Sequence, residues 1–167
     1  WAAFFETPQP VNNNTLQQEK KTNENIITPN INESLKVDKI SRKNSIKSSA
    51  RIKIENDSII GSMSLEGGLI DDISFKKHKQ NLESNLNVEF LNPAQTENGF
   101  YVETGWTSIG NKIKVPSKKS IWKVKGNKVL SDKEPVVLEW NNNEGIIFKK
   151  RLELDQKYLF RITQEVK

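Results

Sequence analysis

His78 is the single histidine of the chain, and it lies within the basic run Lys76–Lys79. Imidazole titrates near neutral pH, so a histidine that is oriented by a carboxylate can transfer protons or bind a metal ion. The lysines around His78 disfavour a positive charge on its ring and repel a metal ion. No carboxylate lies near His78 in the sequence, although a partner distant in the sequence stays open. We therefore predict that His78 is a structural or exposed residue.

Asp71 and Asp72 are adjacent carboxylates, and paired carboxylates can act as a general acid and base. Adjacent side chains of a strand point to opposite faces, so we expect these two not to share a substrate. Asp71 is in phase with Leu69, Ile73 and Phe75, where burial of a carboxylate is costly unless it accepts hydrogen bonds. Either hydrogen bonds from turn amides or a β-bulge that shifts the register would explain its position.

The tripeptide Glu66-Gly67-Gly68 is not a phosphate-binding loop, because no helical pattern follows it and no Gly-Lys-Ser/Thr element is present. Two adjacent glycines supply the positive φ angles of a tight hairpin. We predict structural turn residues at Gly67, Gly68 and Asp71. The chain has no cysteine, which excludes disulfides, thiolate nucleophiles and thiolate zinc sites.

Aromatic residues in the middle of the chain could stack against sugars or bases if they were exposed. Trp106 and Trp140 keep phase with apolar neighbours, so we expect both in the core. Trp122 keeps phase only with Val124, and we predict that any aromatic surface contains Tyr101 and Trp122. We predict no catalytic, cofactor-binding or metal-binding residue anywhere in the chain, and no cofactor.

Composition indicates one domain and a polar tail. The 167 residues are 34% hydrophobic, and the mean hydropathy is −0.69. The formal charge of +5 is compatible with nucleic acid, an anionic membrane surface or a solvated exterior. We interpret the basic residues as interleaved with Asp and Glu, which favours the solvated exterior and no nucleic acid.

From Arg51 onward, apolar and polar residues alternate with the two-residue period of a β-strand. The dipeptides Asn56-Asp57 and Gly126-Asn127 and the run 141–145 supply further turns. No stretch keeps a helical period, so we predict an all-β fold in the form of an antiparallel sandwich. The expected strands lie at 51–55, 58–65, 69–75, 86–90, 100–106, 121–125, 128–130, 136–140, 146–154 and 158–166.

The beginning of the chain has a different character. The aromatic and apolar run Trp1–Phe5 precedes a Pro-containing polar stretch, as at the end of a membrane helix, so we predict the end of an anchor over residues 1–7. Residues 8–50 are rich in Asn, Gln, Lys, Glu, Ser and Thr without periodicity, which predicts a disordered linker. We assign residues 51–167 to the sandwich.

Four segments, in this order, resemble the YidC/Oxa-type membrane protein insertases, in particular the periplasmic domain of alphaproteobacterial members. They are GSMSLEGGLIDDISFKKHK at 61–79, FLNPAQTENGFYVETGW at 90–106, VPSKKSIW at 115–122 and LEWNNNEGIIFKKRLELDQKYLFRITQEV at 138–166. The resemblance covers about residues 51–166. It depends on the number and order of the segments, because each one is structural.

The resemblance implies part of a β-super-sandwich related to galactose-mutarotase-like folds, with only the N-terminal part of the domain present. It implies a non-catalytic periplasmic domain of an inner-membrane protein that assists insertion and folding of membrane proteins. The implied partners are the Sec translocon, nascent membrane proteins and, through an anchor, the inner membrane. Two alternatives stay open: a carbohydrate-binding or adaptor module of the cell envelope, and, by fold analogy alone, a mutarotase-like enzyme.

Overall fold

The computed structural model describes residues 39–167, and predictions for residues 1–38 lie outside this part of the chain. Two short helices and nine strands are present among the described residues. In chain order they are α1 Arg42–Lys47, β1 Arg51–Glu55, β2 Ile59–Ser64, β3 Ile70–Lys79, β4 Asn87–Leu91, the 3₁₀ helix η1 Ile109–Asn111, β5 Lys123–Lys125, β6 Val129–Leu130, β7 Val136–Asn141, β8 Ile147–Leu154 and β9 Phe160–Val166.

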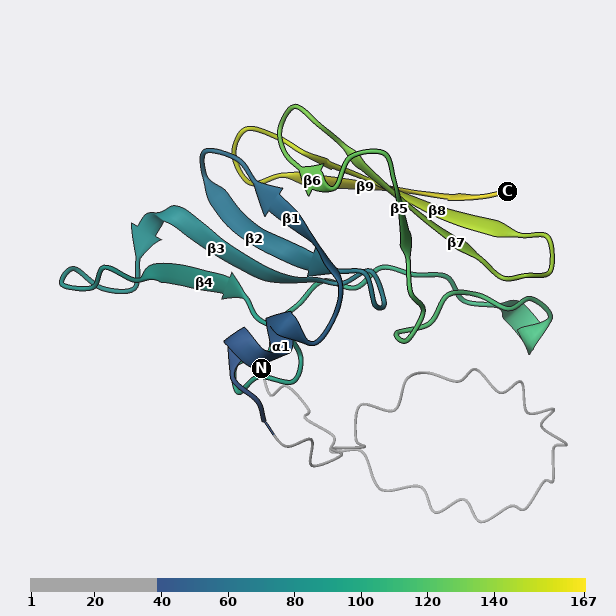
Figure 1. The fold of residues 1–167 in the computed structure, drawn as a ribbon, viewed down its shortest axis with the longest axis horizontal. Coiled ribbons are helices and arrows are strands. Elements are labelled where there is room, and N and C mark those ends of the chain that lie inside the picture. Colours follow the sequence, from purple (N-terminus) through teal and green to yellow (C-terminus); the bar gives the residue numbers. More distant parts are fainter. Residues whose placement is uncertain (1–38) are drawn as a thin grey trace, which may run out of the picture. The chain divides into compact units, whose positions relative to one another are not determined.

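The strands form two sheets, which lie as separate layers in Figure 1. One sheet has the order β4-β3-β2-β1-β6, and the other has the order β5-β7-β8-β9. All pairings between these strands are antiparallel except that of β6, which runs parallel to β1. The predicted all-β fold with mainly antiparallel sheets is therefore confirmed.

A single apolar core joins the two sheets, because the alternating side chains of both are buried in one cluster. In β1, Ile52 and Ile54 are buried while Lys53 between them is exposed, as the two-residue period predicts. The buried hydrophobic residues are Ile52, Ile54, Ile59, Met63, Ile70, Ile73, Leu91, Trp122, Leu130, Val136, Leu138, Phe148, Leu152 and Leu154.

One predicted strand is absent, and one predicted turn joins strands of different sheets. Residues 100–106 do not form a strand; they make isolated bridges from Phe100 to Asn92 and from Val102 to Ile70. Gly126 has a positive φ of 81°, but the turn at Gly126-Asn127 does not close a hairpin. Its flanking strands β5 and β6 lie in different sheets, because each finds a longer strand to pair with, β7 and β1.

A short helix, α1, lies within the stretch that we predicted as a linker. Ser41 caps its N-terminus by accepting a hydrogen bond from the Asn44 amide. Tertiary contacts explain a helix in a sequence without helical period, because Ser45 is buried and donates to Gln95. The boundaries of the anchor and the linker stay predictions. No helix of the described residues is long and apolar enough to cross a membrane.

Gly61 of β2 lies where the backbone of β3 approaches closely. A Cβ atom at this position would lie 1.8 Å from the carbonyl oxygen of Asp72 on β3. We expect Gly61→Ala to lower the free energy of unfolding by about 1–3 kcal/mol, because the two strands must move apart. Urea unfolding of the variant measures this. Gly105→Ala is the control, since nothing lies within 4 Å of a Cβ there. An equal effect of both substitutions would contradict the explanation.

Candidate functional site

A β-bulge in β3 determines where the two adjacent carboxylates lie. Ser62 of β2 pairs with Asp72 and Met63 pairs with Ile70, so Asp71 is the extra residue without a partner. The bulge takes Asp71 out of phase with the core residue Ile73. The expectation that the two carboxylates lie on opposite faces is therefore wrong, because it assumed a regular strand. Of the two explanations considered for Asp71, the bulge is the one observed.

Both carboxylates belong to one hydrogen-bonded network on the face of the sheet opposite the core. The guanidinium of Arg51 binds Asp71, and that of Arg42 binds Asp72. Arg51 Nε also donates to Ser62 Oγ at 2.8 Å, and Ser62 Oγ donates to Asp72 Oδ2 at 2.6 Å. Both carboxylates are buried. Burial raises the pKa of Asp71, while the hydrogen bond from Arg51 opposes this change. The network fixes the two carboxylates in place.

A polar pocket of ≈ 270 Å³ borders this network and brings together Asp71 and Tyr101, two residues singled out in the sequence. Its hydroxyl and charged groups are mostly paired with one another: Ser49 Oγ lies 2.9 Å from Ser64 Oγ, and Lys118 lies 3.5 Å from Glu103. Tyr101 is half-buried. The pocket offers hydrogen bonds, but it holds no imidazole to act as a base.

The Gly67-Gly68 turn lies directly against an indole ring. Both glycines have positive φ angles, 71° and 65°, in the loop between β2 and β3. A Cβ atom at Gly68 would lie 3.1 Å from Trp122 Nε1. Trp122 is only 1% exposed, so the expectation that it forms an exposed aromatic surface with Tyr101 is corrected. It is buried because it stacks on Trp106 beneath the turn, with ring centroids 6.0 Å apart.

Lys150 is a buried cation in the core, and the sequence analysis missed it. Its side chain is on the same face of β8 as Phe148 and Leu152, and the residue is 1% exposed. The ammonium donates to the Thr104 carbonyl and lies 4.9 Å from the ring centroid of Trp122. Burial lowers the pKa of Lys150 to about 8. With so little exposure, this amine cannot reach a substrate from solvent.

His78 is exposed, at the end of β3. Its Nε2 lies 3.4 Å from the Tyr158 hydroxyl, and its ring meets the edge of Phe75. Within residues 39–167, no carboxylate is hydrogen-bonded to the His78 ring. In the same residues, no group of three or more His, Cys, Asp or Glu side chains is placed to hold a metal ion. The prediction of a structural or exposed histidine agrees with this position.

An apolar groove of ≈ 540 Å³ lies where the two sheets diverge. Only His78 and Tyr158 contribute polar side-chain atoms to its lining. The other residues that line it are Ile59, Ile70, Ile73, Phe75, Phe90, Leu91, Val102, Phe160 and Ile162. Such a surface can cover an apolar segment, but it supplies no reactive group.

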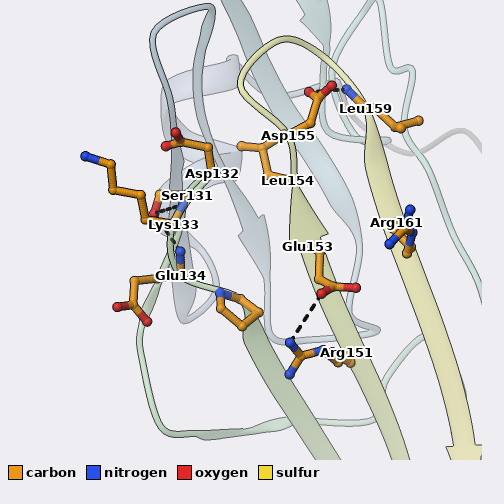
Figure 2. A pocket seen from close by; sticks show the side chains of 11 residues that line it. Ser131, Asp132, Lys133, Glu134, Arg151, Glu153, Leu154, Asp155, Leu159 and Arg161 are labelled. Atoms are coloured by element: carbon orange, nitrogen blue, oxygen red, sulfur yellow. Dashed lines mark hydrogen bonds and ion pairs between the residues drawn. The ribbon is translucent and has the colours of Figure 1, made fainter.

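A charged cleft of ≈ 390 Å³ lies beside the ends of β8 and β9, and Figure 2 shows its side chains. Arg151 donates to Glu153 at 3.2 Å. Asp155 accepts hydrogen bonds from the amides of Leu159 and Lys157, which lower its pKa. Glu153 therefore belongs to an ion pair, and Asp155 stabilises a turn. Dashed lines in Figure 2 mark both interactions. Neighbouring groups therefore already engage Glu153 and Asp155 within the cleft.

The geometry thus describes paired charges and apolar surfaces. A model of the YidC periplasmic domain matches residues 51–167. The chain belongs to the YidC periplasmic domain family. The resemblance predicted from the four sequence segments is confirmed.

The relatives of this YidC periplasmic domain are named membrane protein insertase YidC. That of Pelagibacter ubique (strain HTCC1062) is 33% identical over 166 residues, which are 99% of this chain and 30% of that protein. Those of Rickettsia canadensis (strain McKiel) and Rickettsia prowazekii (strain Madrid E) are each 41% identical over 117 residues, or 70% of this chain and 21% of each relative. The chain therefore spans less than a third of these relatives. No solved structure matches it.

One signal in the sequence could have located the buried cation of this YidC periplasmic domain. Lys150 stands between Phe148 and Leu152 in a strand with a strict two-residue period, so its side chain had to share their face. The network of Arg42 and Arg51 carried no such signal. It depends on a bulge and on a helix that the local pattern does not indicate.

Proposed function

We propose that this chain is a non-catalytic periplasmic portion of a membrane protein insertase, and that it assists insertion and folding of inner-membrane proteins, alone or with the Sec translocon. The match of residues 51–167 to the YidC periplasmic domain carries the proposal. Relatives named membrane protein insertase support it. Under this proposal, residues 1–7 end a membrane anchor, residues 8–50 tether the domain, and the domain faces the periplasm.

The arrangement of titratable groups supports a non-catalytic role. General acid–base chemistry needs two groups that converge on one substrate atom in an accessible site. In this domain, Asp71 and Asp72 have guanidinium partners, and Lys150 is enclosed by indole rings and a backbone carbonyl. The domain then contributes surfaces and stability to the insertase and leaves insertion itself to the membrane-embedded part.

A chimera tests the proposal. In the Rickettsia canadensis insertase, the matched 117 residues are replaced by residues 51–167 of this chain, and the chimera is expressed in bacteria depleted of their own YidC. We expect growth and normal insertion of a reporter membrane protein, because the two segments are 41% identical. The variant His78→Ala in the same chimera should behave identically. A chimera that accumulates normally but does not restore insertion would contradict the proposal.

A further inference from the structure

The basic residues are not interleaved with Asp and Glu everywhere, so our interpretation of the composition was wrong for one segment. Between Thr104 and Ser131 there are seven lysines and no Asp or Glu. All seven are exposed. The segment connects β4 to β6 and includes η1 and β5. A continuous basic segment of this kind is a candidate surface for an anionic partner.

The tip of this segment is a compact turn with exposed apolar side chains. The amide of Ile113 donates to Ser108 Oγ at 3.1 Å, which closes the turn, and Gly110 within it has a φ of 66°. Ile109 is 93% exposed and Ile113 is 45% exposed. The turn therefore presents two aliphatic side chains together with the lysines beside them, an apolar surface that a bilayer interface can cover.

Both ends of the turn are fixed to the domain. Trp106 lies before it and contacts the ring of Phe148 edge to face, at 5.2 Å between centroids. Val115 lies after it and packs against the apolar core. Figure 1 shows the green chain between β4 and β5 leaving the sheets and returning to them. The turn is therefore held in place on both sides, by Trp106 and by Val115.

The lysines next to the exposed isoleucines are not neutralised locally. Among the residues that the structure describes, Lys112, Lys114 and Lys119 have no carboxylate within 4.0 Å; the ion pairs in this segment are those of Lys118 with Glu103 and of Lys125 with Glu139. Exposed aliphatic side chains flanked by unpaired lysines are typical of segments that lie in the interface of an anionic bilayer.

We infer that the turn 108–114 is a membrane-contacting tip, which inserts Ile109 and Ile113 among anionic phospholipids while Lys112 and Lys114 bind the headgroups. A nucleic acid or an acidic protein would attract the lysines, but would leave the two isoleucines without an apolar environment. The inference deepens the proposed function, because it names the surface that a periplasmic domain of a membrane protein would meet.

Flotation of the whole chain with lipid vesicles tests the inference. We expect binding to vesicles of phosphatidylethanolamine and phosphatidylglycerol, weaker binding as NaCl is added, and weaker binding to pure phosphatidylcholine. Lys112→Ser/Lys114→Ser should weaken binding by about 25-fold, since each lysine near an anionic surface contributes roughly five-fold. Ile109→Ser/Ile113→Ser should weaken it by at least ~10-fold.

The matched control is Lys77→Ser/Lys157→Ser, which removes the same charge from exposed lysines outside the segment and should bind like the unchanged chain. All variants should keep the thermal midpoint, because the replaced side chains are exposed. Equal loss of binding in the control, unchanged binding of the isoleucine variant, or equal binding to phosphatidylcholine would each overturn the inference. The assay contains no translocase or substrate, so its failure would leave the chimera experiment unaffected.

Discussion

Replacement of Arg51 by Met is expected to lower the free energy of unfolding by about 3–5 kcal/mol at neutral pH. Arg51 is the guanidinium partner of Asp71, and the side chains of both are mostly buried, at 10% and 7% exposed. Without the guanidinium, a carboxylate stays in a site that already disfavours its charge. Ser62 loses the hydrogen bond from Arg51 Nε as well.

Two further variants separate this explanation from a simple loss of packing. Arg51→Met/Asp71→Leu should recover most of the lost stability, since an apolar pair leaves no unpaired charge. Arg151→Met removes an exposed partner of Glu153, 3.2 Å away, and should cost less than about 1 kcal/mol. Urea denaturation measures all three. If Arg51→Met and Arg151→Met have the same effect, the buried network does not stabilise the sheet as described.

Replacement of Lys150 by Met is expected to remove a pH-dependent contribution of about 3 kcal/mol to the free energy of unfolding. The pKa of Lys150 is lowered from 10.5 to about 8 in the folded chain, because burial disfavours the ammonium. Between these two pH values the unfolded chain binds more protons, so stability contributed by Lys150 rises with pH. The shift corresponds to about 3 kcal/mol, gained between pH 8 and pH 10.5.

The measurement is the free energy of unfolding of the unchanged chain minus that of Lys150→Met, followed from pH 7 to pH 11. We expect this difference to increase with pH across the window and to level off above it. At pH 7, Lys150→Met should unfold no more easily than the unchanged chain, because methionine fills a similar volume without a buried charge. A difference that does not vary with pH would refute the interpretation that Lys150 is buried and loses its proton in this pH range.

Lys149 is the matched control for Lys150, one position along β8. It pairs with Glu139 at 2.6 Å, and this contact raises the pKa of Lys149. The sign is therefore opposite: its contribution to stability is complete below the unfolded pKa and is lost as the pH rises through the folded pKa. The same difference measured with Lys149→Met should be constant at neutral pH and fall in strong alkali.

Much of the fold could be predicted because the alternation of side chains directly reflects burial. Strand β1 and the pair β8 and β9 lie where the two-residue period places them. The failures have a different physical origin. Residues 100–106 alternate correctly but make only bridges, and the period is blind to the bulge that moves Asp71. Both depend on the register in which the backbones pair, which the alternation of side chains does not determine.

The candidate site was less predictable than the strands. The glycines of the turn were identifiable because positive φ angles favour glycine. Trp122 was predicted at the surface because only Val124 keeps phase with it, whereas Trp106 and the Gly67-Gly68 turn cover it from other parts of the chain. The burial of a side chain by other parts of the chain depends on tertiary contacts, which the local periodicity of the sequence does not reveal.

The parallel pairing of β6 with β1 has a consequence for the order of events during export. Lys53 pairs with Val129, so one edge of β1 has no partner until residues far downstream have appeared. Contacts of this range delay folding, because a long loop must close first. A polypeptide that emerges N-terminus first would therefore leave this edge of β1 unpaired until β6 has emerged, well after β2, β3 and β4 have joined the same sheet.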